Sequence, residues 1–287
     1  MLRFFYLTLC LSFFAPLPAQ QLTDRSIDPK TESVYRVRTL YEGLGGLAVM
    51  LGSTAGIDDL RNKPDISDET LVRLQQTETG RLDRWGLEQD ALRRRRGEEA
   101  SDRVFNASIL LTAGLFIDKK FRKDWLDIGV LYLQAHALSA ATYAYSPLGP
   151  RFIDRYRPVV YYKELSYDER RAGNNRNGFF SGHVSTTAVG TFFFTKVLSD
   201  YNPQWTGTQR ALAFTLAALP PAYVGVQRVR ALKHFPTDSV VGLGVGAFFG
   251  VMVPQVHKVW QRKHVSQLSI GGNYRDGAGS AGLVLTF

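Results

Sequence analysis

Residues 227–238 read QRVRALKHFPTD, and this stretch is the one around which the rest of the chain is interpreted. It places Arg228 six residues before His234 and Asp238 four residues after it. Arginine binds phosphate oxygens through a permanent charge and a fork of donors, and imidazole acts as base or acid near neutral pH. This stretch therefore predicts a site that handles phosphate.

Two shorter stretches upstream supply groups of the same kind. One is Arg157-Pro158, and the other is Ser181-Gly182-His183, directly before an apolar segment. Glycine lets the backbone come close to a ligand, and the N–H groups at a helix start favour anions. We expect the hydroxyl of Ser181 to add a donor and His183 to stand at the mouth of the site, suited to general acid work.

The carboxylate of Asp238 has a predicted role of its own. An aspartate four residues after His234 can accept a hydrogen bond from one imidazole nitrogen and so leave the other nitrogen free to attack. This arrangement is what a phosphoester hydrolase with a histidine nucleophile needs.

Together the three stretches resemble the motifs of the type 2 phosphatidic acid phosphatase superfamily, which also contains bacterial acid phosphatases and vanadium haloperoxidases. The family pattern is Lys, six residues and Arg-Pro; then Pro-Ser-Gly-His; then Ser-Arg, five residues, His, three residues and Asp. The resemblance covers roughly residues 100–256 and implies a helical core bundle. By that resemblance His234 would form a phosphohistidine, Asp238 would orient it, and His183 would protonate the leaving group. The residues that would hold the phosphate oxygens are Arg157, Arg228, Ser181 and Gly182.

The sequence departs from the family pattern at three positions. The lysine of the first motif falls on Pro150, which has no charged side chain, and Arg151 is the predicted substitute, with Arg155 as another candidate. The other two departures are Phe180 in place of proline and Gln227 in place of serine.

Six apolar segments predict an all-α fold, a six-helix bundle of the phosphatidic acid phosphatase type 2 and haloperoxidase kind. Pro220-Pro221 should kink or end the fifth helix. The tail alternates like two strands around a glycine-rich turn, which predicts a short C-terminal β-hairpin. The six segments are 41–57, 104–117, 126–145, 183–198, 209–226 and 238–256.

The domain organisation follows from these segments and from the first twenty residues. A basic Arg3, an apolar core and a Pro-rich end favour a secretory signal peptide, and the single cysteine, Cys10, lies within it. Disulfides and thiol catalysis are therefore not expected in the mature chain. The predicted parts are a signal peptide (1–20), an N-terminal helix with a charged insert (21–103), a catalytic helical bundle (104–260) and a β-hairpin tail (261–287).

The chain is basic, with a formal charge of +9 and a pI near 9.6. This favours anionic partners without choosing among phosphate esters, lipids and nucleic acid. The run Arg93–Arg96 is followed at once by glutamates, which is typical of a solvated helix end. We expect a phosphorylated small molecule or lipid as substrate, no nucleic acid, and no metal or cofactor.

Membrane and soluble interpretations both remain open. The apolar segments are at or below the length of about 20 residues that spans a bilayer. Two basic clusters, 119–123 and 258–263, would lie on one side of a bundle whose site faces the other side. We expect a membrane-associated bundle in the cell envelope with an extracytoplasmic site, the alternative being a soluble periplasmic bundle.

The predicted function is hydrolysis of a phosphomonoester or diphosphate, with lipid phosphates among the candidate substrates, by a phosphoric ester hydrolase. Two alternatives use the same residues differently. One is a vanadate-dependent haloperoxidase-like enzyme, and the other is a non-catalytic helical envelope protein whose site has decayed.

Overall fold

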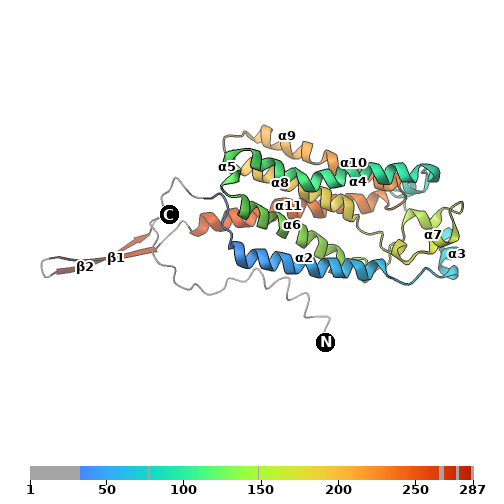
Figure 1. Ribbon diagram of the computed structural model, residues 1–287, viewed down its shortest axis with the longest axis horizontal. Coiled ribbons are helices and arrows are strands. Elements are labelled where there is room, and N and C mark those ends of the chain that lie inside the picture. The colour runs from blue at the N-terminus through green and yellow to red at the C-terminus, as the bar shows by residue number, and fades with distance from the viewer. Residues whose placement is uncertain (1–32, 77, 148, 265–267, 276–277, 286–287) are drawn as a thin grey trace, which may run out of the picture. The chain divides into compact units, whose positions relative to one another are not determined.

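The computed structural model describes residues 33–76, 78–147, 149–264, 268–275 and 278–285 (Figure 1). The predicted signal peptide, residues 1–20, lies outside the described residues. The α-helices are α2 (Thr39–Arg61), α3 (Asp68–Gln76), α4 (Arg94–Leu111), α5 (Lys119–Arg122), α6 (Trp125–Tyr145), α7 (Tyr167–Arg171), α8 (Gly182–Asp200), α9 (Gly207–Ala217), α10 (Leu219–Arg230) and α11 (Pro236–His264). The 3₁₀ helices are η2 (Arg84–Leu87), η3 (Ala91–Arg93), η4 (Thr112–Ile117), η5 (Pro158–Tyr161) and η6 (Gly173–Arg176), and the strands are β1 (Leu268–Arg275) and β2 (Ala278–Leu285).

Each of the six apolar segments lies in helical structure, so the prediction of an all-α bundle is confirmed. The segment 209–226 is divided between α9 and α10 at Ala218, with Pro220 and Pro221 in the first turn of α10. Proline is tolerated there because the first N–H groups of a helix have no partner within the helix. In the predicted hairpin region β1 and β2 pair antiparallel, with Leu268 opposite Leu285.

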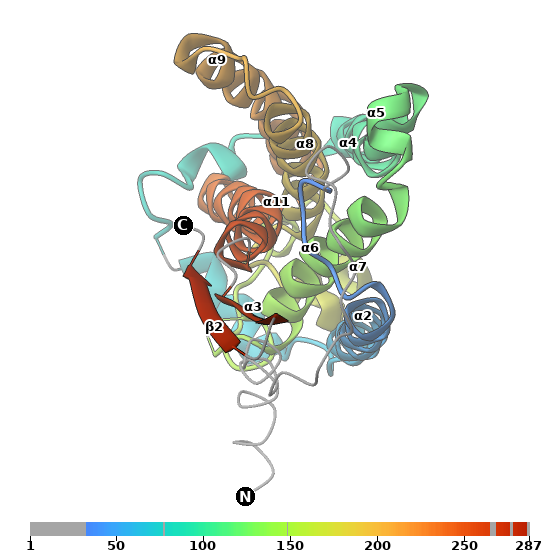
Figure 2. The same cartoon turned by 90° about the vertical axis from the view of Figure 1, so that its left-hand side faces the viewer.

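Helix α8 packs against α4, α6, α10 and α11. The view along the helices shows α11 beside α8 (Figure 2). Its contact with α11 depends on three glycines spaced four residues apart, Gly242, Gly246 and Gly250. A Cβ at Gly246 would lie 2.1 Å from the carbonyl oxygen of Ser185, and one at Gly242 would lie 2.6 Å from that of Ser181. Small residues at this spacing let two helix backbones approach closely. The seam therefore holds the start of α8 directly against the start of α11.

Helix α2 packs along α6 through glycines of the segment 41–57. A Cβ at Gly46 would lie 3.3 Å from Gln134, and one at Gly56 would lie 2.6 Å from the hydroxyl of Tyr145. On the same α6, His136 packs edge-on against Tyr132 at 4.4 Å. Its Nε2 has no hydrogen-bond partner among the described residues.

The charged region 58–103 contains helix α3 and the first half of α4. Helix α4 begins at Arg94, within the run 93–96, so this run begins a helix instead of ending one. Cations are unfavourable at a helix N-terminus, and Arg94 is compensated by Glu169, whose carboxylate lies 3.0 Å from its Nε.

A second small core lies under this region and supports two of the three motifs. The amide of Val159, next to Arg157-Pro158, donates to the carbonyl of Leu232, just before His234, at 3.2 Å. Apolar side chains from the insert cover this junction, which fixes the first and third motifs relative to each other. The buried members of this core are Ile66, Leu71, Leu74, Ala91, Val159, Val160, Tyr162 and Leu232.

Candidate active site

The third motif is held by the way in which α10 ends. Leu232 has φ of 59°, the left-handed conformation, and its side chain is fully buried. The amide of Lys233 donates to the carbonyl of Arg228 at 3.0 Å, and that of Leu232 donates to Val229 at 2.9 Å. These bonds form a Schellman motif, which is usually built with glycine. The reversal places His234 between the end of α10 and the start of α11.

His234 is 3% exposed and is oriented by a backbone carbonyl. Its Nδ1 lies 2.7 Å from the carbonyl oxygen of Gly178. Because a carbonyl only accepts, Nδ1 carries the hydrogen and Nε2 keeps its lone pair. Burial, with Arg157 and Arg228 nearby, lowers the pKa of His234 well below its usual value. The ring is therefore neutral at neutral pH, as a nitrogen nucleophile must be.

Asp238 has different partners from those predicted. Its carboxylate accepts from the amide of Phe235 at 2.8 Å and lies 3.3 Å from Nε of Arg155. Among the described residues no hydrogen bond joins it to His234, so its predicted orienting contact is replaced by that of Gly178. The reason is its position in the first turn of α11, where a carboxylate is drawn to unpaired backbone N–H groups. Its backbone carbonyl accepts from the amide of Ser181 at 3.0 Å, which joins the second motif to the third.

Three buried donors near His234 have no hydrogen-bond partner in the described part of the chain. They are Nε of Arg157, Nε of Arg228 and the hydroxyl of Ser181. Buried polar groups are nearly always paired, so three unpaired donors from three motifs indicate a place for an acceptor. We call these three side chains the donor cluster.

The two arginines of the donor cluster are also electrostatically unfavourable toward each other. Arg228 is 5% exposed, and burial together with Arg157 lowers its pKa to about 10. Burial likewise lowers the pKa of Arg157. Two desolvated cations next to each other are compensated best by a bound anion.

His183 lies in the first turn of α8, beside Gly182, whose missing side chain leaves open space. Its ring contacts that of Phe105 with centroids 4.6 Å apart, and its side chain is 34% exposed. Burial and the nearby Arg228 and Arg157 lower the pKa of His183 to about 3. His183 is also among the groups that lower the pKa of His234.

Arg151, the predicted substitute for the missing lysine, points to another part of the bundle. Its guanidinium lies 3.3 Å from Asp59 of α2 and 5.2 Å from the ring centroid of Tyr145. Arg155 is closer to the motifs, where its guanidinium is paired with Asp238 and Asp83. Each of these arginines thus has a carboxylate partner already, unlike Arg157.

Three contributors to the site carry no motif signal. Gly178 acts through its carbonyl oxygen, which any residue type possesses. The carboxylate of Asp83 accepts hydrogen bonds from the hydroxyl of Thr237 at 2.8 Å and from the amide of Thr237 at 3.0 Å. Asp102 lies 3.3 Å from Nε2 of His183. Both carboxylates belong to the charged region, where acidic residues are too frequent to single one out.

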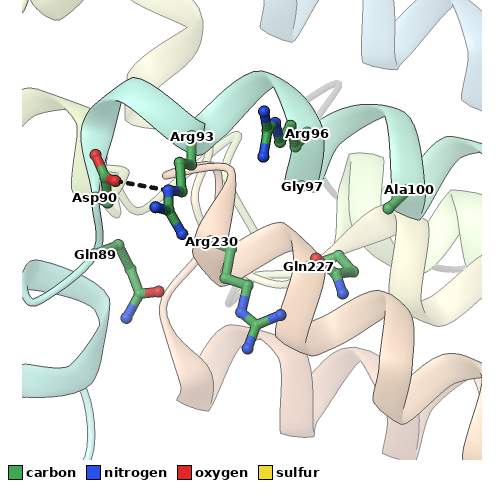
Figure 3. Close-up of a pocket in the computed structure, with 8 residues that line it drawn as sticks. All are labelled: Gln89, Asp90, Arg93, Arg96, Gly97, Ala100, Gln227 and Arg230. Atoms are coloured by element: carbon green, nitrogen blue, oxygen red, sulfur yellow. Dashed lines mark ion pairs between the residues drawn. The ribbon is translucent and has the colours of Figure 1, made fainter.

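A pocket of about 500 Å³ lies beside the site, on the seam between α4 and α10 (Figure 3). It is basic, and its Arg93 is paired with Asp90 at 3.1 Å. Gln227 lines it, whereas the adjacent Arg228 belongs to the donor cluster. The lining residues are Gln89, Asp90, Arg93, Arg96, Gly97, Ala100, Gln227 and Arg230. The pocket therefore shares two helices with the site, and Gln227 is the one lining residue that belongs to a motif.

The depressed histidine pKa values predict a stability that falls in acid. In the unfolded chain, histidines become protonated below a pKa of about 6.5. In the folded protein His183 and His234 stay neutral at the same pH, because their pKa values are lowered. The folded protein therefore loses stability as pH falls from about 6.5 toward the folded pKa values. Buried His234 alone gives a slope of about 1.4 kcal/mol per pH unit, and the third-exposed His183 gives less. Melting temperature between pH 7.5 and 4.5 should fall less steeply for His183→Asn than for the wild type. Parallel curves would contradict the prediction.

Comparison with known proteins gives one match. The model of the PAP2 superfamily matches residues 127–262, which contain all three motifs. No curated protein and no solved structure matches the chain. Among the described residues no group of three or more His, Cys, Asp or Glu side chains is placed to hold a metal ion.

Proposed function

Because residues 127–262 form a PAP2 superfamily domain, we propose that the chain is a phosphatase that cleaves phosphomonoesters or diphosphates through a phosphohistidine. The observation that carries the proposal is the donor cluster of Arg157, Ser181 and Arg228 next to a neutral His234. A tetrahedral phosphate supplies acceptor oxygens for these unpaired donors and a negative charge that compensates the two arginines.

In the first step Nε2 of His234 attacks phosphorus while the bond from phosphorus to the leaving oxygen breaks. The donor cluster holds the nonbridging oxygens, whose charge must be stabilised through the transition state. His183 gives its proton to the leaving oxygen. The bound phosphate favours this protonated state, because its negative charge offsets the arginines that depress the pKa of His183.

In the second step water attacks the phosphohistidine and the bond between nitrogen and phosphorus breaks. His183, now neutral, accepts the proton of the attacking water, and inorganic phosphate leaves. The carbonyl of Gly178 keeps the hydrogen on Nδ1 of His234 during both steps, so the same nitrogen is regenerated as nucleophile.

The exposed apolar side chains support a membrane location for this activity. One helix in the described part of the chain, over Pro236–Trp260, is long and apolar enough to cross a membrane. Helix α2 exposes Leu40, Tyr41, Leu44, Leu47 and Leu51 along one side. A continuous apolar surface of this kind is typical of a membrane or partner interface.

The basic residues support a site on the extracytoplasmic side. Lys258 pairs with Asp200 at 2.7 Å, and Lys120 donates to Asn202 at 2.9 Å, so both basic clusters lie at the end of α8. His183 lies at its start. Since basic residues favour the cytoplasmic face, the site would open on the opposite face, which suits a lipid phosphate presented there.

The proposal is tested with purified full-length protein in detergent. We expect phosphate release from an aryl phosphate and from a lipid phosphate, and a rise in melting temperature with vanadate, which resembles phosphate in shape and charge. Anion binding without turnover of any phosphate ester would contradict the phosphatase proposal. No stabilisation by vanadate and no turnover would favour the decayed site.

A further inference from the structure

A carboxylate of α4 lies between the proposed general acid and one arginine of the donor cluster. Oδ1 of Asp102 is 3.3 Å from Nε2 of His183 and 3.5 Å from a terminal nitrogen of Arg228. Ser101 is part of the same contact, because its hydroxyl lies 3.4 Å from both Arg228 and Asp102. Asp102 is thus the carboxylate nearest to His183 among the described residues.

The position of Asp102 is not explained by structural support alone. Its side chain is 46% exposed, so it does not fill the core. It precedes the matched residues 127–262 and belongs to none of the three motifs. It also places a negative charge where a phosphate binds, which costs affinity unless the charge serves another purpose.

We propose that Asp102 is a positioning residue for His183, accepting from its Nε2–H and compensating the imidazolium that must form before the leaving group is protonated. This inference rests on the proposed phosphatase function. During the first step the imidazolium transfers its Nδ1 proton to the leaving oxygen, and its Nε2–H remains donated to Asp102. The ring of Phe105 also packs against the ring of His183, with a tilt of 34° between the two planes.

Two effects of opposite sign follow when the charge of Asp102 is removed. General acid catalysis weakens, because the imidazolium of His183 loses its nearby countercharge. Phosphate binding strengthens, because Arg228 no longer shares its charge with the carboxylate of Asp102. An Asp102→Asn variant should therefore have a lower kcat together with a KM that is unchanged or lower.

The pH profile and the leaving group give readouts that a merely structural role would not move. A general acid is lost as pH rises through its pKa in the enzyme–substrate complex. In Asp102→Asn the alkaline limb of kcat should move to lower pH by about one unit, as expected for loss of a half-exposed opposite charge at this distance. The loss of kcat should be at least about tenfold larger for an alkyl phosphate than for 4-nitrophenyl phosphate, whose leaving group needs little protonation.

A matched control is available on the same helix. Glu99→Gln removes the same charge from α4, where the carboxylate is exposed and pairs with Arg103 at 4.0 Å. It should leave the pH profile and the leaving-group dependence as in the wild type. If Asp102→Asn does not fold, Asp102→Ser removes the charge with a smaller side chain, and Asp102→Glu should restore the alkaline limb.

The outcomes separate this inference from the function on which it rests. A shifted limb and a steeper leaving-group dependence in Asp102→Asn, absent in Glu99→Gln, would support it. Activity that requires His234 but is lowered equally for both substrates, with an unmoved limb, would overturn the role of Asp102 alone. Activity that persists without His234 would overturn the proposed function instead.

Discussion

His234→Ala is expected to reduce turnover by at least about 10³-fold and to abolish formation of a phosphorylated protein. Losses of this size are usual when a nucleophile is removed. The reason here is that the ring is neutral, almost fully buried and held through Nδ1 by Gly178, so that Nε2 is the free atom. Acid-quenched reactions with phosphorus-labelled substrate should leave an acid-labile label on the wild type and none on the variant.

The control for this experiment is another histidine of the bundle. His136 lies in α6 against Tyr132, outside the three motifs, and its Nε2 has no partner among the described residues. His136→Gln should keep both turnover and label. Retention of the label in His234→Ala would show that another residue receives the phosphoryl group, and the phosphohistidine mechanism would then be wrong.

The bundle could be predicted because each helix has a local signal that agrees with its packing. Glycines in 41–57 anticipate the close contact of α2 with α6, and Pro220-Pro221 anticipates the break between α9 and α10. The glycine seam of α11 is also visible as a four-residue spacing. The hydrogen bond between the amide of Ser181 and the carbonyl of Asp238 follows from this seam. It could not be predicted, because tertiary packing decides which helix the glycines of α11 face.

The candidate site was predictable only where chemistry depends on side-chain type at a fixed spacing. Arg228 and His234 are joined by the short reversal after α10, so their relation is local. The orientation of His234 by Gly178 could not be predicted, because a carbonyl oxygen has no sequence signature. The spacing of Asp238 predicts a contact with His234, but its carboxylate instead accepts from the amide of Phe235 and contacts the guanidinium of Arg155.

The charged region 58–103 also contains a site residue that local sequence does not reveal. The run 93–96 predicts a solvated helix end, and several ion pairs of the region 58–103 are indeed exposed. Asp83 is the exception, since it is 7% exposed and binds Thr237 and Arg155 beside the site. Nothing in the local sequence distinguishes Asp83 from its exposed acidic neighbours. What selects it is contact with residues about seventy and a hundred and fifty positions away along the chain.

Arg228→Ala is expected to lower kcat/KM by about 10²- to 10³-fold, the usual cost of removing one donor that stabilises transition-state charge. Arg228→Lys should recover only part of this loss, because an ammonium keeps the charge but not the planar fork. Arg230→Ala is the matched control. This arginine is two residues away on α10, exposed, and lines the neighbouring pocket, so its loss should leave turnover unchanged.

The same variant should behave in the opposite way when stability is measured without an anion. Arg228 is a desolvated cation next to Arg157, and its Nε has no hydrogen-bond partner among the described residues. Without a bound anion, Arg228 therefore lowers the stability of the folded protein. Its replacement should leave the melting temperature unchanged or higher, while the stabilisation by vanadate is lost. An unchanged or higher melting temperature together with loss of the vanadate effect is expected of an arginine whose charge is compensated only by a bound anion. A purely structural arginine would instead give a lower melting temperature, with the vanadate effect retained.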